Sequence, residues 1–412
     1  MTATRFATIL KRGVAEIITE ADLLRLLNSG RILTLKQGFD PSAPDIHLGH
    51  VVGLRKLRQL QELGHKVILI VGDWTARIGD PSGQSATRPM LSPNEIESNA
   101  QTYMEQFFKV VDKDKTELRW QSEWFSQFNL DEVIKLTSKF TIAQLLARED
   151  FNKRYGSGNP ISLTEMLYPL LQGYDSVAIQ ADVEFGGSDQ KFNCLVGREL
   201  QQSTGQPPQQ VFLVPLLVGT DGHRKMSKSL NNQIGIAEPP REIYGKVMSI
   251  PDLLMVDYFE LVTDVPEEEI AEFKKQLKTR SINPMNLKKR LAHEIVKQFH
   301  GKQAADEAQE YFQGKYQRRE LHKMEATAII GLKVSAEVII RRDMPRWLVN
   351  NKFANSMSEA KRLLAQGAVQ IIRADGTRQV VRDEKVEIKP DDRIKVGKLR
   401  FAKIVDADKE KT

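Results

Sequence analysis

The chain contains a single cysteine, Cys194, among its 412 residues. One thiol cannot form an internal disulfide or a zinc site made of several thiolates. Proteins of the reducing cytoplasm rarely contain disulfides. We interpret Cys194 as a small buried residue rather than as a nucleophile. The sequence therefore predicts a cytoplasmic protein with no disulfide and no cysteine-based zinc site, and we assign no metal ligands in it.

Long apolar runs are absent as well. No stretch approaches the roughly 18 apolar residues of a membrane span, and the N-terminus lacks the apolar stretch of a secretory signal. The first 14 residues carry two Arg, one Lys and no acid, so a transit peptide is an alternative, disfavoured by a plausible helix at Glu20 to Leu27. A hydrophobic content of 41% and a charged content of 28% are those of a globular protein. We expect two or three domains and no membrane contact.

Three apolar stretches, at residues 32–39, 66–72 and 210–218, predict buried strands. An amphipathic stretch at 47–63, between the first two, predicts a helix. Strand, helix and strand in this spacing form a βαβ unit, and continuous apolar strands are typical of a parallel sheet covered on both faces. We therefore predict an α/β fold built on a Rossmann-like parallel sheet.

Two capping boxes, Ser92 to Glu95 and Ser162 to Glu165, predict helices that run to about Val111 and Ile179. They make up a helical insertion in the sheet. Four parts are predicted along the chain: a catalytic domain at 1–238 with the insertion at about 92–180, a helical domain at 239–325, a linker at 326–343 with a possible strand at 337–340, and a small α+β domain at 344–412.

The common nucleotide loops are also missing, because the chain has neither a Walker A sequence nor G-x-G-x-x-G. Instead, His47-Leu48-Gly49-His50 follows a predicted strand and opens a predicted helix. Helix N-termini at this edge of a sheet bind anionic ligands. Gly49 leaves room for adenine against the backbone. His47 and His50 share a helix face and could donate to phosphoryl oxygens, although two surface histidines are the plainer alternative.

Further along, Lys225-Met226-Ser227-Lys228-Ser229 lies in a polar loop of small residues. Two flexible ammonium groups suit a departing pyrophosphate, and a solvated basic loop is the alternative. Asp80 and Arg88 follow the second strand region in a polar turn, where they could bind an ammonium group and a phosphate.

The helix after Ser162 carries Tyr168, Gln172 and Asp175 on one face. A phenol, an amide and a carboxylate make a poor core face and suit a small polar ligand. Asp189 and Gln190 follow another predicted strand, at 183–185, where a carboxylate and an amide suit ribose hydroxyls and a substrate carboxylate.

Positive charge is concentrated at the C-terminal end. Residues 341–412 carry a net charge of +7, whereas the whole chain carries +6 and the remainder is therefore close to neutral. A basic segment on a neutral body suggests a polyanionic partner, with a solubilising surface as the alternative. Ser356 opens a predicted helix that presents Lys361 and Arg362, which suit phosphate contacts.

Taken together, these residues resemble the bacterial-type tyrosyl-tRNA synthetases, whose class I signatures are the HIGH and KMSKS motifs. The likeness extends over nearly the whole chain, and the last domain resembles an S4 RNA-binding domain. The stretches that carry it are GFDPS and HLGH at 38–50, GDPSG at 79–83, YPLLQGYD at 168–175, GGSDQ at 186–190, KMSKS at 225–229 and NPMNLKKRLAHEIV at 283–296.

The resemblance implies tyrosine and ATP with Mg²⁺ as substrates, no tightly bound cofactor, tRNA(Tyr) as partner, and a homodimer. Tyrosine binding is implied for Asp40, Asp80, Tyr168, Gln172, Asp175 and Gln190. ATP binding or catalysis is implied for Ser42, His47, Gly49, His50, Arg88, Asp189, Lys225, Lys228 and Ser229. Lys361 and Arg362 are implied in RNA binding.

One position departs from the family pattern. Many members have a tyrosine that touches the substrate phenol two residues before Gly38, and this chain has Lys36 there. The second phenol contact is then absent or supplied elsewhere. Three rival interpretations remain: a tryptophan-specific relative, a non-catalytic RNA-binding protein on the same scaffold, and an RNA-modifying enzyme with an S4 domain. The polar helix face and the intact motifs disfavour them.

Overall fold

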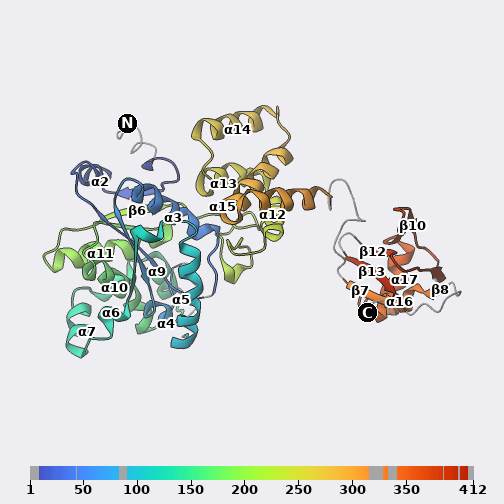
Figure 1. The fold of residues 1–412 in the computed structure, drawn as a ribbon. Coiled ribbons are helices and arrows are strands. Elements are labelled where there is room, and N and C mark those ends of the chain that lie inside the picture. The colour runs from blue at the N-terminus through green and yellow to red at the C-terminus, as the bar shows by residue number, and fades with distance from the viewer. Residues whose placement is uncertain are drawn as a thin grey trace. The chain divides into compact units, whose positions relative to one another are not determined.

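The structure is a computed structural model that describes residues 9–42, 44–82, 91–314, 328–332, 341–383, 385–397 and 400–406. The chain divides into two compact units, residues 1–308 and 309–412. Figure 1 draws the first unit from blue to orange and the second from orange to red. Among the described residues, no helix is long and apolar enough to cross a membrane.

A six-stranded sheet forms the centre of the larger unit (Figure 1), which confirms the predicted α/β fold. The order across the sheet is β1–β6–β5–β2–β3–β4, and all neighbours run parallel except β1 and β6. The strands are β1 (Glu16–Ile18), β2 (Thr34–Phe39), β3 (Lys66–Val71), β4 (Thr116–Trp120), β5 (Val183–Gly187) and β6 (Gln210–Val214). The apolar strands β3 and β6 are buried almost throughout, because helices cover both faces.

Strand β4 was not predicted from the sequence. It pairs in parallel with β3 at the edge of the sheet, inside the stretch interpreted as a helical insertion. Its five residues, TELRW, are all only partly buried. An edge strand with charged residues has no apolar run by which to recognise it.

Helices pack around this sheet, with α3 against β3 and β5, and α11 against β5, β6 and α10. Both predicted capping boxes form, since Ser92 and Ser162 each accept from the backbone N–H three residues on. The helices are α2 (Glu20–Leu27), α3 (Leu48–Gln61), α4 (Thr75–Ile78), α5 (Pro93–Phe107), α6 (Ser122–Phe125), α7 (Leu130–Thr137), α8 (Ile142–Leu146), α9 (Glu149–Gly156), α10 (Leu163–Ala178) and α11 (Lys191–Ser203).

After the sheet the chain is helical, in agreement with the sequence pattern. The helices are α12 (Pro240–Ser249), α13 (Met255–Val262), α14 (Glu267–Thr279) and α15 (Pro284–Phe312). Within α15, Gly301 has φ 85° and breaks the helical geometry, so that the element is two helices joined at a kink. Glycine adopts this conformation at little cost, which allows the chain to change direction there.

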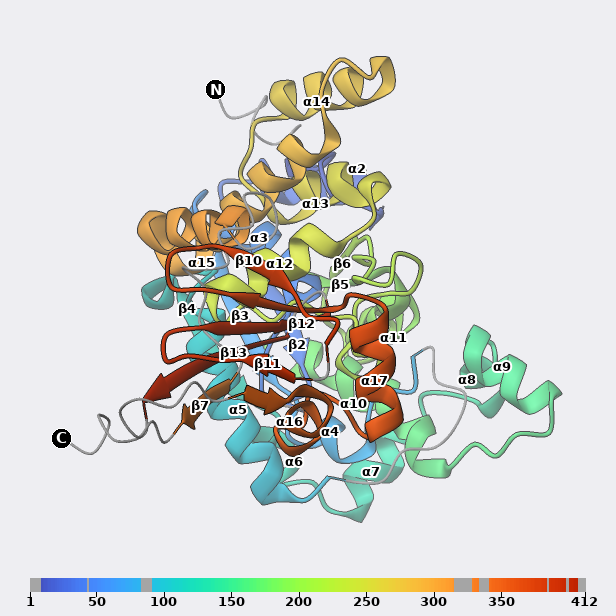
Figure 2. The same ribbon diagram turned by 90° about the vertical axis from the view of Figure 1, so that its right-hand side faces the viewer.

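The smaller unit is an α+β domain. Its main sheet has the order β10–β9–β12–β13–β7, β11 pairs with β8, and Figure 2 shows α17 beside the sheet. The elements are β7 (Ala328–Leu332), β8 (Arg341–Asp343), α16 (Met344–Asn350), α17 (Met357–Ala365), β9 (Val369–Ile372), β10 (Arg378–Val380), β11 (Lys385–Glu387), β12 (Arg393–Val396) and β13 (Arg400–Asp406). Buried apolar side chains of α16, α17 and β9 form its core.

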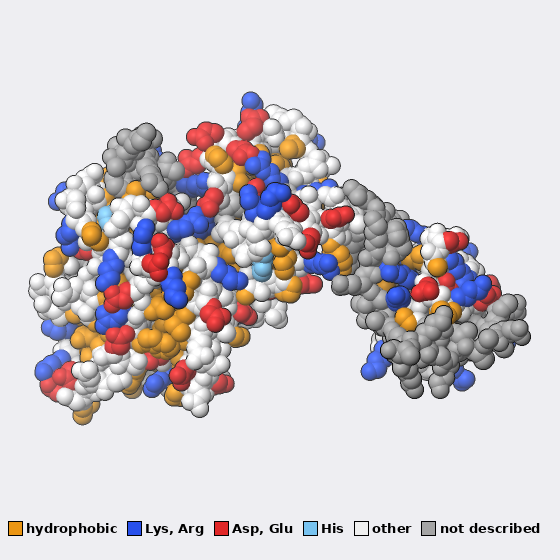
Figure 3. Space-filling view, in the orientation of Figure 1, with side chains coloured by type: hydrophobic (Ala, Val, Ile, Leu, Met, Phe, Trp, Pro, Cys, Tyr) orange, Lys and Arg blue, Asp and Glu red, His pale blue; other side chains and the backbone are white. Residues whose placement is uncertain are grey.

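Two strands of this domain, β7 and β8, fall in the stretch that the sequence assigns to a linker. The strand expected at 337–340 lies outside the described residues. Ser356 caps α17 as expected, accepting from the backbone N–H of Glu359. On the face drawn in Figure 3, Lys and Arg side chains lie beside acidic ones in both units.

Candidate active site

A cavity of about 630 Å³ opens at the carboxyl ends of β2 and β5, beside the N-terminus of α3. Open α/β sheets bind ligands at this edge. Residues that are far apart in the sequence meet there. The predicted site residues that line it are Asp40, Ser42, His47, Gly49, His50, Asp80, Tyr168, Gln172, Asp175, Asp189, Gln190, Lys225, Lys228 and Ser229.

The two histidines are held by the start of α3. His47 is the N-cap residue, and its Nδ1 accepts from the backbone N–H of Gly49 at 3.1 Å. Nδ1 of His50 in turn accepts from the backbone N–H of His47 at 3.1 Å. Because both Nδ1 atoms accept, each neutral ring carries its proton on Nε2. The helix start thus turns both rings into Nε2–H donors at the cavity.

Both rings are uncharged at neutral pH. Burial, with help from Lys228, lowers the pKa of His50 to about 4. Burial and the neighbouring His50 lower the pKa of His47 well below its usual value. Gly49 is required by the same arrangement, since a Cβ there would lie 2.9 Å from the ring of His47. The glycine therefore makes room for the capping histidine, a role that the sequence did not reveal.

The two lysines of the polar loop differ in their surroundings. Lys225 Nζ pairs with Asp189 Oδ2 at 2.8 Å. Lys228 Nζ is buried above the ring of Tyr103, 5.2 Å from its centroid, and no hydrogen-bond partner for it occurs among the described residues. Burial lowers the pKa of Lys228 to about 8. An unpaired, desolvated ammonium group favours an anionic ligand.

At the opposite end of the cavity lies a buried carboxylate, Asp175. Gln121 Nε2 donates to both of its oxygens, at 3.1 and 2.9 Å. Gln121 Oε1 accepts from the backbone N–H of Thr75 at 2.9 Å, so the orientation of the amide is determined. Burial raises the pKa of Asp175 to about 7. Gln121 lines the cavity but was missed from the sequence, because it follows the unrecognised strand β4.

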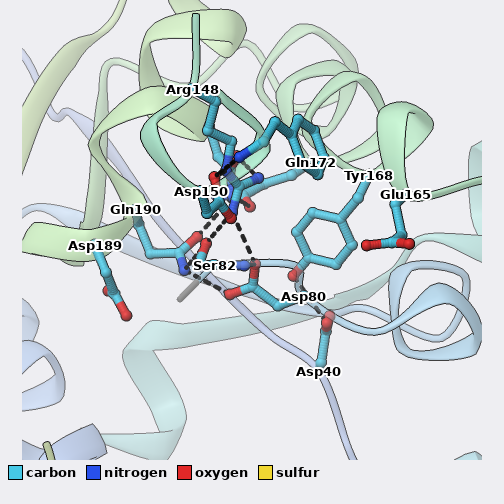
Figure 4. Close-up of polar contacts among 12 residues, drawn as sticks. Asp40, Asp80, Ser82, Arg148, Asp150, Glu165, Tyr168, Gln172, Asp189 and Gln190 are labelled. Atoms are coloured by element: carbon cyan, nitrogen blue, oxygen red, sulfur yellow. Dashed lines mark hydrogen bonds and ion pairs between the residues drawn. The ribbon is translucent and has the colours of Figure 1, made fainter. Parts of the chain in front are cut away.

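Between these ends, acidic groups line the cavity (Figure 4). Tyr168 OH donates to Asp40 Oδ2 at 2.8 Å. Gln190 Nε2 donates to Asp80 Oδ2 at 2.7 Å. Arg148, another residue that the sequence did not indicate, lies 3.6 Å from Asp80 in an ion pair. Asp40 and Asp80 give this middle section negative character, which suits a positively charged group.

Among the described residues that the sequence singled out, Lys36, Lys361 and Arg362 do not line the cavity. Arg88 lies outside the described residues. Lys361 and Arg362 are exposed on α17 in the smaller unit. Lys36 is fully buried and pairs with Glu184 at 3.0 Å. It therefore does not replace the missing phenol contact. In the part of the chain that the structure describes, no three His, Cys, Asp or Glu side chains are grouped so as to hold a metal ion.

The family described as tRNA synthetases class I (W and Y) matches residues 28–317. This chain belongs to that family. The match covers strands β2 to β6, the residues that line the cavity, and helices α12 to α15. It accounts for the co-occurrence of His47 to His50 and Lys225 to Ser229 in one cavity, because these are the two signatures of a class I synthetase.

Curated relatives extend the likeness over both units of this class I synthetase. It is 58% identical to the tyrosine–tRNA ligase of Dehalococcoides mccartyi (strain CBDB1) over 96% of this chain and 98% of that protein. It is 48% identical to the tyrosine–tRNA ligase of Thermotoga maritima over the full length of both.

Solved structures support the fold alone. The tyrosyl-tRNA synthetase of Archaeoglobus fulgidus, complexed with L-tyrosine, has a TM-score of 0.61 at 22% identity, covering 75% of this chain and all of that one. A C-terminally truncated mitochondrial tyrosyl-tRNA synthetase of Aspergillus nidulans has a TM-score of 0.62 at 22% identity, covering 77% and 94%.

Proposed function

We propose that this class I synthetase is a tyrosine–tRNA ligase. It activates tyrosine with ATP, releases pyrophosphate, and transfers the tyrosyl group to the 3′-terminal ribose of tRNA(Tyr). Relatives of that name, 58% and 48% identical over nearly the whole chain, support this function. The observation that carries it is one cavity with buried Asp175 at one end and the histidine and lysine motifs at the other.

The tyrosine side chain lies with its phenol toward Asp175. Gln121 Nε2 donates to both oxygens of this carboxylate, and each oxygen has a further lone pair that can accept from the phenol O–H. Asp80, Tyr168 and Gln172 bind the α-ammonium group, with Asp40 behind Tyr168. Gln190 lies at the carboxylate end. A phenylalanine would leave Asp175 buried without its donor, and this cost disfavours phenylalanine.

The ATP end is built for negative charge. His47 and His50 donate from Nε2 to phosphoryl oxygens, and Lys225 and Lys228 neutralise the departing pyrophosphate. Ser42 and Ser229 lie beside these phosphates. Arg88 joins them by the family resemblance alone. Mg²⁺ arrives with ATP and is held mainly by its phosphates, since such ions keep few protein ligands.

No covalent enzyme intermediate is required. The tyrosine carboxylate attacks the α-phosphate of ATP, and the chain accelerates this step by positioning the reactants and by stabilising the pentacoordinate phosphate. Asp189 contacts the ribose, while Gly49 allows adenine to approach the start of α3. The adenylate then stays in the cavity until the ribose hydroxyl of tRNA attacks its carbonyl carbon, which forms the ester and releases AMP.

The smaller unit is the S4-like domain that binds tRNA(Tyr). Lys361 and Arg362 are exposed on α17, where they contact RNA phosphates. The proposed division is a catalytic domain at 1–238, a helical domain at 239–325, a connection at 326–343 and the S4-like domain at 344–412, and strands β7 and β8 of the connection pair with strands of the S4-like domain. The protein works in the cytoplasm, where tRNA is charged.

A homodimer is the proposed assembly. Large apolar side chains are exposed on α7, α8 and the start of α10, and we propose that they form the apolar patch of a subunit interface. The residues are Leu130, Ile134, Ile142 and Leu163. Sedimentation of the purified protein should give twice the chain mass, and Ile134→Asp should shift it toward the monomer.

Aminoacylation tests the whole proposal. Purified protein, labelled tyrosine and a tRNA(Tyr) transcript should yield acid-precipitable label that depends on ATP, and a tRNA(Trp) transcript should give none. Charging of tRNA(Trp) with tryptophan would instead place the chain with the tryptophan-specific members of the family.

A further inference from the structure

Behind the tyrosine-binding helix α10 lies a fully buried ion pair. Lys36 on β2 and Glu184 on β5 are 0% and 1% exposed, and Lys36 Nζ lies 3.0 Å from Glu184 Oε1. Lys36 Nζ also donates to the backbone carbonyl of Gln172 at 2.8 Å and to Ser176 Oγ at 2.7 Å. Neither charge faces the cavity. Buried charges are costly, so such a pair calls for a specific reason.

The carboxylate of this pair contacts a side chain that does face the cavity. Gln172 Nε2 donates to Glu184 Oε1 at 3.2 Å, and Asn193 Nδ2 donates to Gln172 Oε1 at 3.0 Å. Arg148 Nη1 donates to Asn193 Oδ1 at 3.1 Å on the far side. Two amides are therefore linked between an anion that can only accept and a cation that can only donate.

This linkage leaves each amide one orientation. Glu184 requires the NH₂ group of Gln172 to face it, which turns Gln172 Oε1 toward Asn193 and the cavity. Asn193 Nδ2 also donates to Gln190 Oε1 at 2.9 Å. Gln190 Nε2 is directed toward the carboxylate of Asp80 in turn. The charges at the ends thus orient three carboxamides that would otherwise be free to flip.

We propose that the Lys36–Glu184 pair is a positioning device for substrate recognition: it holds Gln172 Oε1 toward the substrate's α-ammonium group. The inference rests on the proposed function. Gln172 Oε1 has a second lone pair beyond the one used by Asn193, and that lone pair is available to an ammonium donor. Lys36 and Glu184 are positioning residues, because neither touches the substrate.

Lys36 is essential to this arrangement through its charge. Without Lys36, the carboxylate of Glu184 would lie unpaired in a fully buried site, which is strongly destabilising, so the position of this carboxylate beside Gln172 Nε2 depends on the ion pair. Lys36 keeps Glu184 an acceptor, and so keeps the oxygen of Gln172 toward the cavity.

The test measures how much the ammonium group of the substrate contributes to binding, separately from its carboxylate. The variant is Lys36→Met with Glu184→Gln, which removes both charges, preserves volume and leaves an amide that tolerates either orientation of Gln172. Binding of three ligands is measured by calorimetry: tyrosine, tyramine, which has the ammonium group but no carboxylate, and 3-(4-hydroxyphenyl)propionate, which has the carboxylate but no ammonium group.

Tyrosine and tyramine should each bind about tenfold more weakly to the variant, the value of one ordinary hydrogen bond. The propionate should bind as it does to the unaltered protein, and KM for ATP should not change. Arg154→Met with Glu165→Gln is the matched control, because this pair is also buried and also involves α10. The control should leave the ratio of tyramine to propionate affinity unchanged.

Equal weakening of all three ligands, or no weakening in a folded variant, would overturn the inference. If the double variant does not fold, Lys36→Gln with Glu184→Gln provides the same comparison, since it also removes both charges and keeps both side chains polar. If the unaltered protein binds neither tyrosine nor tyramine, the proposed function itself has failed. If the unaltered protein binds tyrosine and tyramine, but the variants do not weaken these two ligands more than the propionate, only the positioning role is refuted.

Discussion

Gln121 donates its side-chain N–H bonds to both carboxylate oxygens of Asp175, at 3.1 and 2.9 Å, in the innermost part of the cavity. The amide of Gln121 is itself held by Thr75. The side chain of Asp175 is therefore held in place before substrate binds. Pre-organised acceptors of this kind lower the cost of ordering the site on binding.

Asp175→Asn should weaken tyrosine recognition. The substitution preserves shape but replaces a charged acceptor, so KM for tyrosine should rise about 10- to 100-fold, corresponding to about 1.5–3 kcal/mol. Discrimination against phenylalanine should fall by a similar factor. Steady-state pyrophosphate exchange measures both. Asp114→Asn, on an exposed turn, is the control and should behave as the unaltered protein.

The pH profile should have an acid limb set by Asp175. Burial raises its pKa to about 7, and only the ionised carboxylate is a full acceptor for the phenol. As the pH falls through about 7, kcat/KM for tyrosine should therefore decrease. The limb should vanish in Asp175→Asn. A profile that keeps the same limb in this variant would assign the titration to another group.

An alkaline limb should follow from Lys228. Burial lowers its pKa to about 8, and the charged form is the one that stabilises pyrophosphate. Adenylate formation should therefore slow as the pH rises through about 8. Lys228→Arg should remove this limb, since an arginine stays charged, and Lys228→Ala should slow the step by about 10²- to 10³-fold. Rapid-quench measurement of adenylate formation distinguishes these outcomes.

His50→Ala should slow activation without affecting tyrosine affinity. The neutral ring donates from Nε2 at the ATP end of the cavity, so its loss should cost about 10²- to 10³-fold in the rate of adenylate formation. Equilibrium dialysis with labelled tyrosine should give an unchanged Kd. An unaltered activation rate would remove His50 from the proposed mechanism.

The double substitution Lys361→Ala with Arg362→Ala should separate the two half-reactions. Pyrophosphate exchange should be unchanged, because both residues lie on α17 in the smaller unit. Binding of tRNA should weaken. The slope of log affinity against log salt concentration should decrease in magnitude by about one to two, because one or two phosphate contacts are lost. A filter-binding titration at several salt concentrations measures this slope.

Much of this architecture could be predicted from the sequence. Local signals define β3, whose run of apolar residues is buried on both faces, and α10, whose capping box forms around Ser162 as expected. The site residues at strand ends and helix starts could also be identified from local signals. Each belongs to a short stretch whose chemistry and position can be recognised together.

Long-range contacts could not be predicted in this way. Gln121 follows an edge strand that lacks an apolar run, and its partner Asp175 is distant in the chain. Lys36 falls in a stretch predicted to be a buried strand, but nothing local indicates a partner for its charge, and only the pairing of β2 with β5 brings Glu184 to it. Such side chains acquire their roles from the pairing of strands, which a single sequence does not specify.

Amino-acid-dependent ATP–pyrophosphate exchange is the most direct test of the central claim. Purified protein is assayed without tRNA, separately with tyrosine, tryptophan and phenylalanine. Exchange with tyrosine alone is the predicted result. Exchange with tryptophan in place of tyrosine, or no exchange by folded protein that still binds tRNA, would contradict the account.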